Sequence, residues 1–157
     1  MNTTLQKLLI SLSVTALIGY AADIRLGTWK LNAAKSKSNL ANPIKTQTDV
    51  REALPDGSVK TTRNGTWADG KSFSYTFTYK YDGREYPVKG APFDTISVKR
   101  IDALTTSFEA SITKVKSKYS VRGTSVVTQD ARTLTQTSKG TDADGKPVES
   151  TLVFERQ

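Results

Sequence analysis

Short turns rich in Asp and Gly interrupt the chain at a nearly constant interval, and they constrain its fold more than any other feature. Clear examples are Pro-Asp-Gly-Ser at 55–58, Ala-Asp-Gly-Lys at 68–71 and Asp-Ala-Asp-Gly-Lys at 142–146. Most turn centres are about 13 residues apart, which leaves room for one strand of about 9 to 10 residues and a tight reversal. The spacing predicts a meander of antiparallel strands.

Between the turns, apolar and polar residues alternate with the period of two that is typical of half-buried strands. The clearest alternation runs over residues 72–81, where Phe and Tyr alternate with Ser, Thr and Lys. Ten strands are predicted, within residues 25–32, 44–54, 59–67, 72–81, 86–88, 94–101, 105–114, 118–128, 132–139 and 147–156. Residues 33–43 have room for a single helical turn.

The more apolar face of each predicted strand is assigned to the interior. In the strand over 44–54, this rule places Ile44, Thr46, Thr48 and Val50 inside and Gln47, Asp49 and Arg51 outside. A long twisted sheet with one apolar face buries that face by closing on itself. We therefore predict an all-β protein, a closed up-and-down antiparallel barrel of 8 to 10 strands. A β-sandwich is the alternative, although it needs longer crossover connections than these turns.

The first 21 residues have the pattern of an export signal. Lys7 precedes an apolar stretch over residues 8–18, and small residues precede a cut after Ala21. We predict a signal peptide over 1–21 and a single domain over 22–157. The chain contains no Cys, which is ordinary for exported bacterial proteins, so the predicted location is the periplasm or the medium of a bacterium.

The composition excludes several kinds of chemistry. With neither His nor Cys in the chain, serine–histidine and cysteine–histidine catalysis are excluded. No acidic pair stands on the predicted inner face, so we expect a protein that is not an enzyme and has no cofactor. Asp142 and Asp144 have part of the spacing of a calcium loop but lack its third oxygen ligand and its terminal Glu. A hairpin turn explains them, and no metal site is predicted.

The net charge of +8 at pH 7 favours anionic surfaces such as those of the bacterial envelope. The basic residues are spread over most hairpins, which indicates a solvated strand face and no specific nucleic-acid site. Nothing in the sequence indicates an oligomer.

Three residues near the ends of the chain resemble the structural signature of the calycins, the superfamily of lipocalins and fatty-acid-binding proteins. Gly27 and Trp29 lie in the first predicted strand, and Arg156 lies in the last one. The resemblance implies that these two strands pair and that the Arg156 side chain crosses the Trp29 ring, which closes one end of the barrel.

The stretch Gly-Thr-Trp-Lys-Leu at 27–31 is similar to the start of many fatty-acid-binding proteins. Their helix-turn-helix lid, however, has no room in residues 33–43. In its overall residue pattern the chain is most similar to small exported lipocalin-like proteins of soil bacteria. The stretch Lys-Tyr-Asp-Gly-Arg-Glu-Tyr-Pro-Val at 80–88 is one example of this pattern. This resemblance implies a fold and supplies no activity.

Several polar residues are predicted on the interior face: Arg63, Arg100, Ser125, Gln136, Tyr75, Tyr79 and Tyr119. An inward Arg with a Tyr hydroxyl would hold a carboxylate or phosphate, and we select Arg63, Tyr75, Tyr79 and Tyr119 as ligand contacts. The leading hypothesis is an exported barrel that binds a small apolar or amphipathic, anionic ligand. The alternatives are a packed barrel that binds envelope polyanions, lipid or a protein, and a carboxylate- or tyrosine-based isomerase or hydrolase.

Overall fold

The structure is a computed structural model and describes residues 23–112, 120–142 and 144–157. Nearly all of these residues belong to β-strands or to the turns between them. Within these ranges, no helix has both the length and the apolar character needed to cross a membrane.

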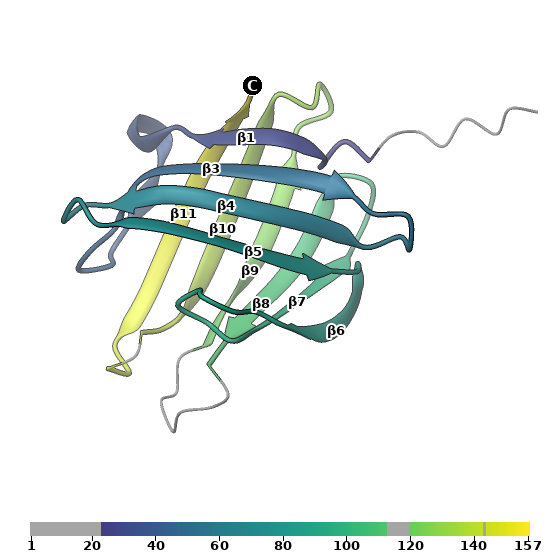
Figure 1. Cartoon of the computed structure of the whole chain (residues 1–157). Helices are drawn as coiled ribbons and strands as arrows, with labels where there is room; N and C mark the ends of the chain where they lie inside the picture. The colour runs from purple at the N-terminus through teal and green to yellow at the C-terminus, as the bar shows by residue number, and fades with distance from the viewer. Residues whose placement is uncertain (1–22, 113–119, 143) are drawn as a thin grey trace, which may run out of the picture.

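Most strands lie where the turn spacing predicts them (Figure 1), but the strand predicted at 86–88 begins at Asp82, and a two-residue strand at 37–38 was not predicted. They are β1 (Gly27–Leu31), β2 (Lys37–Ser38), β3 (Ile44–Ala53), β4 (Val59–Trp67), β5 (Ser72–Tyr79), β6 (Asp82–Pro87), β7 (Thr95–Arg100), β8 (Thr105–Ser111), β9 (Ser120–Val127), β10 (Thr133–Thr141) and β11 (Pro147–Arg156). The segment after β1 forms the 3-10 turn η1 (Ala33–Lys35), in agreement with the single turn predicted there.

Ten strands form one antiparallel meander in the order β5-β4-β3-β1-β11-β10-β9-β8-β7-β6. The short β2 lies outside this path and pairs with β11. Figure 1 shows β1, β3, β4 and β5 on one side of the interior and β7 to β11 on the other. The predicted all-β up-and-down barrel is confirmed, and a single sheet replaces the two sheets of the alternative sandwich.

The barrel is nearly closed, whereas the sequence predicted complete closure. β5 and β6 follow each other in the chain, but no hydrogen-bonded ladder joins them in the part of the chain that the structure describes. Phe93, in the loop after β6, packs edge-on against Tyr75 and Phe77 of β5, with ring centroids 5.9 and 6.2 Å apart. Aromatic packing therefore takes the place of backbone pairing at this position.

The first and last strands of the chain, β1 and β11, pair in an antiparallel seam. Trp29 lies opposite Arg156, and Leu31 lies opposite Phe154. The chain therefore brings its two ends together at one place, as the resemblance to calycins implies.

Buried apolar side chains form two clusters in the interior. The first lies at the seam and is centred on Trp29, Leu134 and Phe154, all fully buried. The second lies on the other side and contains Val59, Phe77, Tyr79, Val88, Phe93, Ile96, Val98 and Ala110. The first cluster fills one end of the barrel, and much of the second borders an open cavity.

Gly65 of β4 allows Phe73 of β5 to lie across the backbone. A Cβ atom at this position would lie 2.1 Å from the Thr46 carbonyl oxygen and 2.4 Å from Cζ of Phe73. Because neither strand can retreat without breaking its ladder, we expect Gly65→Ala to lower the free energy of unfolding by about 1–3 kcal/mol. The shift of the urea midpoint measures this loss.

The neighbouring substitution Asn64→Ala is the control for Gly65→Ala. The Asn64 side chain is exposed, and its Oδ1 accepts a 2.6 Å hydrogen bond from the Ser74 hydroxyl, so its loss is expected to cost only about 0.5 kcal/mol. Equal urea midpoints for the two variants would contradict the close approach at Gly65.

Candidate ligand-binding site

The interior contains a cavity of about 320 Å³ between the two sides of the barrel. This volume is at the lower end of the range of small-molecule pockets, about 300–1,000 Å³. Its apolar and aromatic lining consists of Leu40, Ile44, Trp67, Tyr75, Phe77, Tyr79, Pro92, Phe93, Ile96, Val98, Phe108, Ala110, Val121, Val148 and Leu152. Tyr75 and Tyr79 therefore line the lumen without filling it.

Trp29 and Arg156 meet at the closed end of the barrel. The guanidinium carbon of Arg156 lies 4.5 Å from the centroid of the Trp29 ring system. The same guanidinium donates to the carbonyl oxygens of Ala131 at 2.6 Å, Leu26 at 2.7 Å and Ile24. Gly27 has φ of +109°, and a Cβ atom there would lie 2.6 Å from Nη1 of Arg156. Gly27 therefore makes room for the guanidinium.

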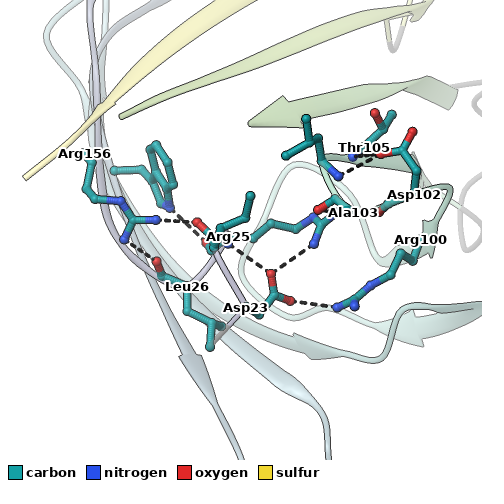
Figure 2. Close-up of polar contacts among 11 residues, drawn as sticks. Asp23, Arg25, Leu26, Arg100, Asp102, Ala103, Thr105 and Arg156 are labelled. Atoms are coloured by element: carbon teal, nitrogen blue, oxygen red, sulfur yellow. Dashed lines mark hydrogen bonds and ion pairs between the residues drawn. The ribbon is translucent and has the colours of Figure 1, made fainter. Parts of the chain in front are cut away.

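The segment before β1 covers the same end (Figure 2). Arg25 is 3% exposed and donates to Asp23 at 3.0 Å and to the carbonyl oxygens of Asp102 and Ala103 at 2.9 and 2.8 Å. Asp23 also accepts a 2.9 Å hydrogen bond from Arg100, which lies at the rim and is 48% exposed. Each of these charges therefore has a partner, and Arg100 is not the interior residue that the sequence predicted.

The face assigned to β3 from the sequence is wrong. Gln47, Asp49 and Arg51 are buried, with exposed fractions of 2, 0 and 7%. Thr46 is exposed instead. The reason lies in the pairing with β4, where Asp49 stands opposite Arg63. Residues directly opposite in a ladder share one face, so the inward Arg63 requires an inward Asp49.

Asp49 and Arg63 form a bidentate ion pair in the wall of the lumen. Nε of Arg63 lies 2.8 Å from Oδ1 of Asp49, and Nη2 lies 2.6 Å from Oδ2. Gln47 donates to Oδ1 from 2.9 Å. Burial alone would raise the pKa of the Asp49 carboxyl, but the nearby Arg63 charge, assisted by Arg51 and Gln47, holds it below its usual value. Asp49 is therefore ionised, and it neutralises Arg63.

Arg51 is left with a weaker partner and lines the cavity. Its Nη2 lies 3.5 Å from the same Oδ2 of Asp49 that Arg63 binds more closely. Among the described residues, the buried Nε of Arg51 and the hydroxyl of Thr61 have no hydrogen-bond partner. Thr61 stands opposite Arg51 in the ladder and also lines the cavity. Together they offer hydrogen-bond donors to a molecule in the lumen.

Polar groups also line the cavity from the other side of the barrel. Thr106 stands opposite Ser125, and Ser125 stands opposite Gln136, on three adjacent strands. All three residues line the cavity. The lumen is thus mainly apolar, with a few polar groups that can orient a ligand.

The structure brings together two of the four predicted ligand contacts. Nη1 of Arg63 lies 3.5 Å from the hydroxyl of Tyr75, and both residues line the cavity. Tyr79 lines it further along β5. Tyr119 lies outside the described residues. The sequence reasoning missed Asp49 and Arg51, which the register between β3 and β4 would have revealed.

The turn residue Asp142 satisfies its own backbone. Its Oδ1 accepts hydrogen bonds from the amides of Asp144 and Lys146 at 2.9 and 2.8 Å. No group of three or more His, Cys, Asp or Glu that could hold a metal ion occurs among the described residues.

The lumen continues toward η1 and β2, at the end opposite Trp29. A second hollow of about 380 Å³ lies under this segment, lined by Ser36, Lys37 and Ser38 among others. Leu40 and Ile44 line both spaces. This end is the mouth of the lumen.

No protein-family model matches the sequence, and no curated protein matches it. Solved structures do match the fold. One is the fluorescent protein UnaG, with 11% identity and a TM-score of 0.52 over 84% of this chain and 96% of that chain. Another, from Nostoc punctiforme, belongs to the DUF3598 family of unknown function. It has 14% identity and a TM-score of 0.54 over 85% of this chain, which spans 47% of the other.

A redesigned β-barrel, mFAP1, whose structure was solved with DFHBI bound, has 14% identity and a TM-score of 0.47 over 87% of this chain and 98% of that chain. At these identities, the likeness to UnaG and the Nostoc protein concerns the fold alone. With the ten-stranded meander and the β1–β11 seam, it shows a calycin-like β-barrel.

Proposed function

We propose that this protein is an exported, non-enzymatic barrel that binds a small amphipathic anion in its lumen. Export rests on the signal-like pattern of residues 1–21. Binding rests on the cavity, which combines an apolar and aromatic lining with the side chain of Arg51.

The buried Arg51 carries this proposal. A guanidinium that is only 7% exposed needs partners for its donors, and its Nε has none among the described residues. A carboxylate or phosphate supplies the matching acceptors. The apolar part of the same ligand then extends along Phe77 and Val98 toward the mouth near Leu40. This arrangement buries both the charged and the apolar part of one molecule.

The surface-binding alternative requires a packed lumen, and the observed cavity of about 320 Å³ does not favour it. An isomerase or hydrolase would need a carboxyl or phenol that is free to exchange protons with a substrate. The inward carboxyl of Asp49 is committed to Arg63 and Gln47. Non-covalent binding is the function that the site supports best.

Blocking the lumen tests this proposal. Ala110 is buried on β8 and lines the cavity, so Ala110→Phe is expected to weaken binding at least about tenfold. Binding is measured by displacing anilinonaphthalene sulfonate, a fluorescent amphipathic anion, with dodecanoate. Circular dichroism checks that the variant remains folded.

Val126→Phe is the matched control, because Val126 is 41% exposed on the neighbouring strand and does not line the cavity. It is expected to bind like the unaltered protein. Equal affinities for all three proteins would place the binding site outside the lumen and overturn the proposal.

A further inference from the structure

Three ionised side chains in one wall of the lumen leave a single uncompensated positive charge. Asp49 carries one negative charge, and Arg51 and Arg63 carry one positive charge each. We infer that this balance makes the lumen selective for monoanions, such as carboxylates, over both dianions and neutral amphiphiles. The inference rests on the proposed function and adds the charge that the ligand must carry.

The selectivity follows from the cost of unpaired charge in an apolar cavity. A neutral ligand would cover Arg51 while leaving its charge without a partner. A dianion would pair one charge with Arg51 and leave the other beside the carboxylate of Asp49. A monoanion leaves neither an unpaired positive charge on Arg51 nor a second negative charge beside Asp49. The bidentate contact of Asp49 with Arg63 prevents Arg63 from serving as a second free counterion.

Other charged groups near the lumen do not alter this balance. At the mouth, Glu149 is 62% exposed and lies 3.0 Å from Nζ of Lys139. At the closed end, Arg25 and Arg100 share Asp23, and the Arg156 guanidinium binds carbonyl oxygens; none of these residues lines the cavity. Burial raises the pKa of the nearby Tyr81, so its phenol is neutral. The uncompensated charge in the wall of the cavity therefore belongs to Arg51.

Three ligands with one chain length test the selectivity: dodecanoate, dodecyl phosphate and dodecanol, each used below the concentration at which it aggregates. At pH 8, where the phosphate ester is a dianion, dodecanoate is expected to bind at least about tenfold more tightly than either competitor. Competition against anilinonaphthalene sulfonate gives the three affinities.

Dodecyl phosphate also allows the monoanion and the dianion of one ligand to be compared. Its second pKa is about 6, so it becomes a monoanion when the pH falls from 8 to 5. The chain contains no His, so no side chain with an ordinary pKa in this interval confuses the result. The affinity of the unaltered protein for dodecyl phosphate is expected to rise at least about fivefold on acidification.

Two variants change the charge of the wall. Asp49→Asn raises the excess from one to two positive charges and is expected to bind dodecyl phosphate at pH 8 at least as tightly as dodecanoate. The double variant Asp49→Asn/Arg63→Met returns the excess to one and is expected to regain the preference for dodecanoate. If Asp49→Asn does not fold, the affinity of the unaltered protein for dodecyl phosphate at the two pH values decides the matter.

The outcomes separate this inference from the proposed function. The charge selectivity is overturned, while lumen binding stands, if folded Asp49→Asn ranks the ligands as the unaltered protein does. It is also overturned if the unaltered protein prefers the dianion at pH 8 or gains no affinity for dodecyl phosphate on acidification. If none of the three ligands displaces the probe from the unaltered protein, the proposed function itself fails.

Discussion

Replacing Trp29 by alanine is expected to lower the free energy of unfolding by about 3–5 kcal/mol. The side chain is fully buried, and its Nε1–H donates to the Arg25 carbonyl oxygen at 2.9 Å. The substitution opens a cavity beside Leu134 and Phe154 and removes the ring under the Arg156 guanidinium. Urea unfolding followed by far-ultraviolet circular dichroism measures the loss.

Trp67, the second of two tryptophans, is the matched control. It lies at the mouth, is half-buried, and contacts the Phe73 ring at 4.9 Å between centroids. Trp67→Ala is expected to cost only about 1 kcal/mol. Equal losses for the two tryptophans would contradict the packing of the closed end.

A double-mutant cycle isolates the contact between Trp29 and Arg156. Arg156→Ala removes three hydrogen bonds to carbonyl oxygens and is expected to cost about 3 kcal/mol by itself. Because the ring also orders the guanidinium, the combined loss should fall short of the sum of the single losses by about 1–2 kcal/mol. Additive losses would mean that the stacking contributes nothing.

The sequence predicts the strands of this barrel well because each turn contains residues with a defined backbone role. The Asp-Gly turns limit the strand lengths, and the alternation over β5 places Phe77 and Tyr79 inside, where the structure has them. The open position between β5 and β6 was not predictable in this way. Only two residues link these strands, which on its own indicates a hairpin, whereas Phe93 from a more distant loop decides the packing.

The charged part of the candidate site was missed because β3 was interpreted by apolar content alone. Its Thr and Val residues gave one face an apolar appearance, while Asp49 and Arg51 looked like solvent-facing charges. Burial of Asp49 is tolerated because Arg63 lies opposite it, and this pairing follows from the hairpin turn at residues 55–58. Considering both strands together would have placed Asp49 inside.

No periodic pattern in the sequence predicts the contacts of residues 23–26. Arg25 and Arg156 bind backbone carbonyl oxygens that come from separate turns. Such acceptors exist at every residue, so only the folded arrangement identifies them. The closed end therefore depends on residues that look like an ordinary connection in the sequence.

Removing Arg63 alone is expected to destabilise the protein by about 3–5 kcal/mol at pH 7, because Arg63→Met leaves the buried Asp49 carboxylate with only the 3.5 Å contact to Arg51 as an ion pair. The double variant Asp49→Asn/Arg63→Met removes the buried negative charge as well and should recover most of that loss. Urea unfolding of the unaltered protein and both variants measures these differences.

Lowering the pH should change the free energy of unfolding of these proteins differently. In the unaltered protein the pKa of Asp49 is lowered, so its contribution is complete above the unfolded value of about 3.9 and is lost only as the pH falls through the lower folded value. Burial is the largest single effect on the Asp49 carboxyl, and without Arg63 it is no longer outweighed, so the pKa of Asp49 rises above the unfolded value. The folded Arg63→Met variant then takes up a proton between pH 7 and 4.5 and gains stability relative to the unaltered protein.

The double variant has no carboxyl at this position, so its difference from the unaltered protein should stay constant over the same interval. A deficit of Arg63→Met that is equally large at pH 7 and pH 4.5 would show that Asp49 does not depend on Arg63 for its charge.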